Sequence, residues 1–178
     1  MNCSTTEAGQ IKTPRPATRT RSRNEPGQTF DLRRQIPECE LLRLALLATA
    51  SQVSPAFSAG VVGCVHPLPA ANLASLLAFA YSTGRIASED IVAECQKTPV
   101  MNYLAMGRPM EWTELRRFRR QHRGLVVACL AELLRLVRDQ YLRCDDVAED
   151  TAALSNPEIT AQQLVQQAIL ADLATIDL

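Results

Sequence analysis

The chain has little of what strands and catalytic sites are built from. Aromatic residues make up 4% of its 178 positions, and glycine occurs only seven times. Hydrophobic residues still reach 47%, so the core has to be built from Leu, Ala and Val, a composition that favours helices over strands. The sequence also has no Gly-rich phosphate loop and no G-x-S-x-G motif, two signatures of enzymes. We therefore expect an all-α protein that is not an enzyme.

Metal and disulfide chemistry has equally little support. Six cysteines are scattered without a C-x-x-C pair, and His66 and His122 are the two histidines. A zinc site needs clustered ligands, so we expect neither a metal nor another cofactor, and no small-molecule substrate. No signal peptide precedes the cysteines, which indicates reduced thiols in a cytoplasmic protein.

No charged residue occurs between Leu44 and Gly84, which raises the question of a membrane segment. Prolines and glycines interrupt this stretch. Its one uninterrupted helical piece, residues 70–81, is shorter than the about 20 residues that a bilayer requires. The stretch therefore predicts a buried core segment and no membrane association.

The formal net charge of zero conceals a division along the chain. Lys and Arg outnumber Asp and Glu by 18 to 11 in residues 1–138, a net charge of +7, whereas residues 139–178 hold one against eight, a net charge of −7. Such a division favours either nucleic-acid binding by the basic part or masking of that part by the acidic one.

Composition divides the chain into four segments. Residues 1–30 form a basic arm with almost no apolar periodicity, so we expect it to be disordered. Residues 31–143 carry the helical pattern, residues 144–156 form an acidic linker, and residues 157–178 hold a last helix that suits docking or dimerisation.

Capping and breaking residues predict a compact bundle of about six to seven helices. Ser88 and Thr113 are expected to cap helices, and Gly84 is expected to end one. The short helices and tight turns around them indicate a helix-turn-helix-like portion. The expected helices cover residues 37–51, 70–81, 88–97, 99–104, 112–123, 125–141 and 157–174.

The helix at residues 112–123 is the strongest candidate for a binding surface. At about 100° per residue, Arg116, Arg119, Arg120 and Arg123 fall at i, i+3, i+4 and i+7, so they share one face. Trp112, Leu115 and Phe118 lie on the neighbouring arc and can anchor the helix to a core. The candidate contacts to DNA phosphates are Arg116, Arg117, Arg119, Arg120 and Arg123.

Two motifs in this order carry a family resemblance. The first is Tyr81-Ser-Thr-Gly84, and the second is Arg116-Arg-Phe118-Arg-Arg-Gln-His122. Together they make the chain from about Phe30 to Val137 resemble the helical N-terminal domain of bacterial insertion-sequence transposases of the DDE type. The resemblance marks Tyr81, Gly84, Phe118 and His122 as family-motif residues.

The resemblance implies a non-catalytic, transposase-derived domain that binds DNA or oligomerises. In the family an RNase H-like catalytic domain follows, and positions 139–178 are too few for one. The chain also has Glu89 and Asp90 where the family has basic residues. The expected partners are DNA, a second copy of the chain or an intact transposase. The alternative is a protein-interaction module or inactive remnant whose arginine face is solvated, or masked by the acidic C-terminal segment.

Overall fold

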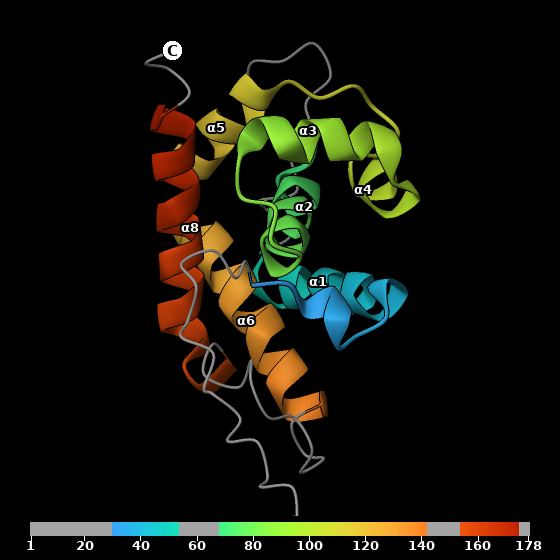
Figure 1. The fold of residues 1–178 in the computed structure, drawn as a ribbon, viewed down its shortest axis with the longest axis vertical. Helices are drawn as coiled ribbons and strands as arrows, with labels where there is room; N and C mark the ends of the chain where they lie inside the picture. The colour runs from blue at the N-terminus through green and yellow to red at the C-terminus, as the bar shows by residue number, and fades with distance from the viewer. Residues whose placement is uncertain (1–29, 54–67, 142–153, 175–178) are drawn as a thin grey trace, which may run out of the picture.

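The computed structural model describes residues 30–53, 68–141 and 154–174 (Figure 1). These residues form helices and no strand, which confirms the all-α bundle for the described part of the chain. The predicted disorder of the N-terminal arm and most of the acidic linker lie outside the described residues. The elements are η1 (Leu32–Arg34), α1 (Glu38–Gln52), α2 (Ala70–Ser82), α3 (Ser88–Lys97), α4 (Pro99–Leu104), α5 (Trp112–Gln121), α6 (Arg123–Tyr141) and α8 (Pro157–Ala174).

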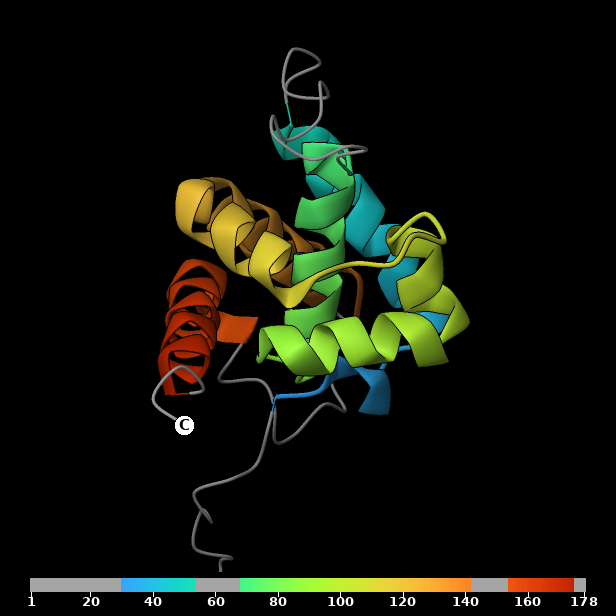
Figure 2. The ribbon, with the colours of Figure 1, turned by 90° about the horizontal axis from the view of Figure 1, so that it is seen from above.

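Helix α2 lies at the centre of the bundle. Figure 2 shows α1 and α4 on one side of α2, α5 and α6 on the other, and α3 across one end. Every α2 residue from Leu73 to Ser82 is buried. This burial explains why the helix has no charged residue, because an unpaired charge on it would lose its hydration. The predicted buried core segment is confirmed for residues 73–82.

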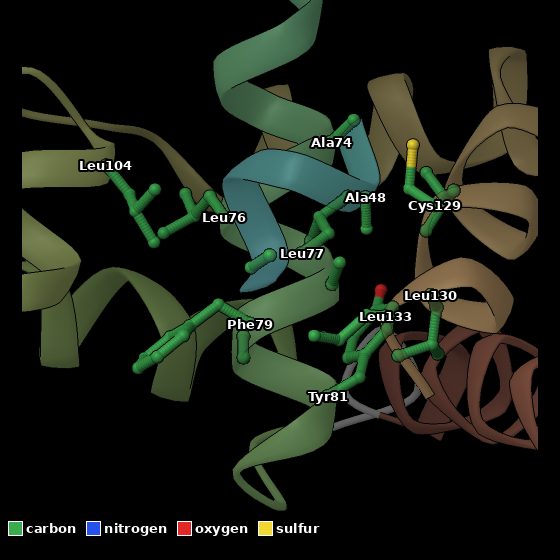
Figure 3. Packing of buried hydrophobic residues seen from close by; sticks show 14 of the residues in the cluster. Ala48, Ala74, Leu76, Leu77, Phe79, Tyr81, Leu104, Cys129, Leu130 and Leu133 are labelled. Atoms are coloured by element: carbon green, nitrogen blue, oxygen red, sulfur yellow. The ribbon is translucent and has the colours of Figure 1, made fainter. Parts of the chain in front are cut away.

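The core is built from aliphatic side chains and alanines. Leu76 and Phe79 of α2 lie on the side of α4, where Leu104 is buried (Figure 3). Leu130 and Leu133 of α6 are fully buried on the other side of α2. Alanines on α2 leave room for close approach of the neighbouring helices, which keeps the interior close-packed although it has few aromatic residues.

A glycine ends α2, as predicted. Gly84 has a φ of +76°, in the left-handed region that glycine enters without steric cost. The Gly84 amide donates to the carbonyl oxygen of Tyr81 at 3.1 Å, and the Arg85 amide donates to that of Ala80 at 2.9 Å. These two bonds form a Schellman motif, which turns the chain from α2 towards α3.

The two predicted capping side chains do not cap. Ser88 is the first residue of α3, and the N-cap position is held by Ala87. Thr113 lies inside α5, where its hydroxyl donates to the side chain of Glu111 at 3.1 Å. Both predictions were wrong because each hydroxyl has a side-chain carboxylate as its hydrogen-bond partner. For Ser88 that partner is an aspartate on α8.

Helix α8 packs along α6 and reaches α5 at its C-terminal half (Figure 1). The buried side chains of α8 follow a helical stripe, and they include Ala161, Leu164, Val165 and Ala168. The last helix therefore docks through this face on α6 and α5 of its own chain. No helix in the described part of the chain combines the length and apolar character needed to cross a bilayer.

Two Gly→Ala substitutions should change stability in opposite directions. Gly84→Ala places a Cβ at a positive φ and should lower the free energy of unfolding by about 1 kcal/mol. Gly124→Ala is the matched control, because Gly124 lies in α6 and an added Cβ meets nothing within 4 Å. It should raise stability by about 0.5 kcal/mol. Urea denaturation followed by circular dichroism measures both changes, and equal effects of the two substitutions would contradict the turn geometry.

The described cysteines should differ in reactivity. Burial raises the pKa of the Cys95 and Cys129 thiols to about 11, so only about 0.1% of either would be thiolate at pH 8. Cys39 is exposed. Mass spectrometry after brief iodoacetamide treatment at pH 8 should find Cys39 modified well before the two buried thiols. Equal modification of all three in the folded protein would show that the core opens on that timescale.

Candidate nucleic-acid interface

Helix α5 carries the arginines on two differently placed faces. Leu115 and Phe118 are fully buried and hold the helix against the core, as the sequence predicted. Trp112 is more exposed, at 42% of its surface. Because Arg116 and Arg119 lie close to the buried arc and Arg117 and Arg120 lie opposite to it, the arginines have two different environments.

Arg119 is completely buried, with an exposed fraction of 0%. Its Nη1 donates to Oδ2 of Asp172 at 2.6 Å and to the carbonyl oxygen of Ala168 at 2.7 Å, both on α8. Its Nη2 donates to the hydroxyl of Ser88 at 3.1 Å. The guanidinium carbon lies 5.5 Å from the ring centroid of Tyr81 on α2. One side chain thus contacts α2, α3 and α8 from α5.

Asp172 supplies the negative charge that this buried cation requires. Besides binding Arg119, its carboxylate accepts hydrogen bonds from the amide of Ser88 at 3.2 Å and from the Ser88 hydroxyl at 3.1 Å. A carboxylate at the first turn of α3 also interacts favourably with the positive end of that helix dipole. Asp172 therefore compensates both a guanidinium and a helix terminus.

Arg116 extends the same cluster towards the surface. It is 7% exposed, its Nε lies 3.5 Å from Oδ1 of Asp172, and its Nη2 lies 3.5 Å from Oε1 of Glu89. The guanidinium carbon stacks 4.2 Å from the ring centroid of Trp112, a cation–π arrangement. Glu89, which departs from the basic residue of the transposase pattern, is thus a partner of an α5 arginine.

Burial corrects the prediction that Arg116 and Arg119 contact DNA phosphates. Arg119 is fully buried and Arg116 is 7% exposed, and both already have Asp172 as their anionic partner in place of a phosphate. The reason is tertiary, because the pairing residue lies 53 positions from Arg119. The predicted helix also ends earlier than expected, at Gln121, so Arg123 belongs to α6. Of the four arginines on the predicted face, Arg116 and Arg119 are buried, and Arg120 and Arg123 are exposed.

Arg117, Arg120 and Arg123 are exposed. Arg117 and Arg120 lie three residues apart on the outer face of α5, so their side chains are neighbours. Arg123 opens α6 and donates from Nη2 to Oε1 of Gln166 at 2.9 Å. For these three arginines, phosphate contact stays a prediction.

The four family-motif residues either lie in the core or end a helix. Tyr81 is fully buried beneath Arg119, and burial raises the pKa of its phenol above the ordinary value. Gly84 makes the turn after α2. Phe118 is buried with its ring centroid 4.8 Å from that of His122. The amide of His122 donates to the carbonyl oxygen of Phe118 at 2.8 Å, which ends α5.

The sequence contained one signal for the buried cluster. Asp172 follows Ala168 by four residues, so it continues the inward stripe of Ala161, Leu164, Val165 and Ala168 on α8. An aspartate on an otherwise apolar inward face predicts a buried cationic partner. Two such partners existed on α5, at Arg116 and Arg119.

In residues 30–53, 68–141 and 154–174, no three His, Cys, Asp or Glu side chains gather as ligands of a metal ion would. Comparisons with protein-family models, with curated proteins and with solved structures give no match to this chain. The transposase resemblance accordingly stays a hypothesis based on the motif residues.

Replacing Asp172 should be among the most damaging single changes. Asp172→Ala leaves Arg119 buried without its counter-charge, and the free energy of unfolding should fall by about 3–5 kcal/mol. Asp139→Ala is the matched control because Asp139 pairs with Arg138 on the surface, with exposed fractions of 54% and 36%. It should cost no more than about 0.5 kcal/mol. Urea denaturation separates the two outcomes.

A double variant checks the mechanism of that loss. If the uncompensated charge is the cause, Arg119→Met combined with Asp172→Leu should be clearly more stable than Asp172→Ala alone. If the double variant is no more stable, the loss comes from packing at α8 and the ion pair is not its origin.

Proposed function

We propose that this chain is a non-catalytic, transposase-derived helical module that binds DNA through its phosphate backbone. The observation that carries the proposal is the set of exposed arginines at Arg117, Arg120 and Arg123 on and just after α5. Arginine makes charge-assisted, often bidentate hydrogen bonds to phosphate oxygens. Contacts of this kind position a protein on DNA but carry little sequence information.

The buried face of α5 supports this role because its contacts hold the helix, and with it the exposed arginines, in one position. Leu115 and Phe118 are buried in the core, and Arg119 is held by α8. A guanidinium on a fixed helix loses less conformational freedom on binding than one on a mobile segment. The exposed arginines are thus displayed from an ordered support. A cytoplasmic location suits such a role, and the described thiols of Cys39, Cys95 and Cys129 are free.

A second candidate function rests on the Asp172 contacts. Asp172 belongs to the acidic C-terminal part of the chain, and it occupies two of the arginines that the sequence assigned to DNA. This observation favours a module whose arginine face serves internal packing and which does not bind DNA. The two candidates differ in what they require of Arg117 and Arg120.

Salt dependence of DNA binding tests the proposal. With three phosphate contacts, the logarithm of the binding constant should fall with the logarithm of salt at a slope of about −2.7, a loss of about 40-fold between about 50 mM and 200 mM salt. Arg117→Ala combined with Arg120→Ala should weaken binding at low salt and reduce that loss to about 3-fold. Fluorescence anisotropy with a labelled duplex of about 30 base pairs measures both.

The control removes the same charge elsewhere. Arg34→Ala combined with Arg138→Ala takes two arginines from η1 and the C-terminal part of α6, far from α5 in Figure 1. This variant should keep the steep salt dependence. No binding by the unaltered chain at low salt supports the second candidate, and equal effects of the two double variants overturn the assignment to α5.

A further inference from the structure

Helix α8 has an exposed face of unusual composition. Its first turn carries Glu158, and its one other charged residue, Asp172, is buried against α5. The exposed residues after Glu158 are glutamines, an alanine and three large apolar residues. Ile159, Leu170 and Leu173 are 55%, 54% and 44% exposed. Since the inner face is also apolar, α8 lacks the charged outer face of an ordinary surface helix.

The exposed apolar residues of α8 follow a regular spacing. Ile159, Gln163, Gln166, Leu170 and Leu173 are separated by four, three, four and three residues. This alternation is the 3.5-residue repeat of a coiled-coil seam. All five are exposed, so the repeat lies on the outer face of α8, where Gln166 accepts a hydrogen bond from Arg123 at the start of α6. In Figures 1 and 2, α8 lies at the edge of the described helices, which leaves that face accessible.

We propose that this seam pairs with α8 of a second copy of the chain in antiparallel orientation. In antiparallel pairing, a register exists in which Ile159 faces Leu170 of the other copy and Gln163 faces Gln166. Ile159 and Leu170 then pack on each other, and amides meet amides that can hydrogen-bond to them, while Leu173 lies beyond the first residue of the partner's α8. The same surface serves both partners, as two-fold symmetry requires. Polar residues within a seam are a recognised way of fixing its register.

Electrostatics favour the antiparallel orientation over the parallel one. Antiparallel helices align their dipoles favourably. In this register Glu158 of one copy lies near residues 168–172 of the other. That part of α8 contacts Arg116 and Arg119 of α5, and the exposed Arg120 belongs to the same helix. The two Glu158 carboxylates lie at opposite ends of the antiparallel pair, whereas parallel pairing would bring them together, and Asp172 near the partner's Glu158 is buried and paired with Arg119.

Sedimentation velocity of the full chain tests the pairing without DNA, so its result is independent of the proposed function. The contact involves one helix per copy, and we expect a change from monomer to dimer between about 1 µM and 300 µM protein. Leu170→Arg should weaken the dimer by at least about 10-fold. The matched control is Leu47→Arg, at a leucine of α1 that is 48% exposed, and it should leave the dimer unchanged.

Two charge variants test the orientation. Gln163→Glu combined with Gln166→Lys places opposite charges together only in the antiparallel register, so the dimer should persist. Gln163→Lys combined with Gln166→Lys should dissociate it. A monomer at all concentrations, a dimer unaffected by Leu170→Arg, or equal dissociation by both charge variants would each overturn the proposal.

Discussion

The buried contact between Arg119 and Asp172 is the interaction on which the arrangement of the helices around it depends. It joins the outer side of the bundle at α8 to α5, to the first turn of α3 and to the Tyr81 ring on α2. An arginine in this place has little tolerance for a lost partner, because water cannot replace the carboxylate. The positions of four helices are therefore coupled through one charge pair.

This coupling divides the arginine helix into a structural and an available part. Arg116 and Arg119 use their charge inside the molecule, and Arg117 and Arg120 present theirs to solvent. The two roles alternate between adjacent residues, which point about 100° apart on the helix, and the same residue type serves both. The number of arginines on a helix thus overstates how many can bind phosphate, because some are paired with carboxylates inside the protein.

Local signals predicted the helices well because they act within the element that they define. Gly84 ends α2 through its own positive φ, and the uncharged α2 sequence matches the burial of that helix. The site was predicted less well because its geometry depends on residues distant in sequence. Ser88 suited an N-cap, but its hydroxyl contacts Asp172, 84 positions away. The position of Asp172 on an apolar stripe predicts a buried cationic partner, but it does not say that the partner lies on α5.

Asp172 is both the partner of Arg116 and Arg119 and a residue of the acidic C-terminal part. Truncation of that part therefore cannot distinguish a masked arginine face from a loss of folding. Removing α8 would expose Arg119, but it would also uncover the apolar stripe on α6 against which α8 packs. Any change in DNA affinity would then reflect partial unfolding as much as the release of a charged face. Point substitutions at exposed positions avoid this difficulty. Arg117 and Arg120 test the outer face of α5 and Leu170 tests the outer face of α8, and neither test disturbs the Arg119–Asp172 contact.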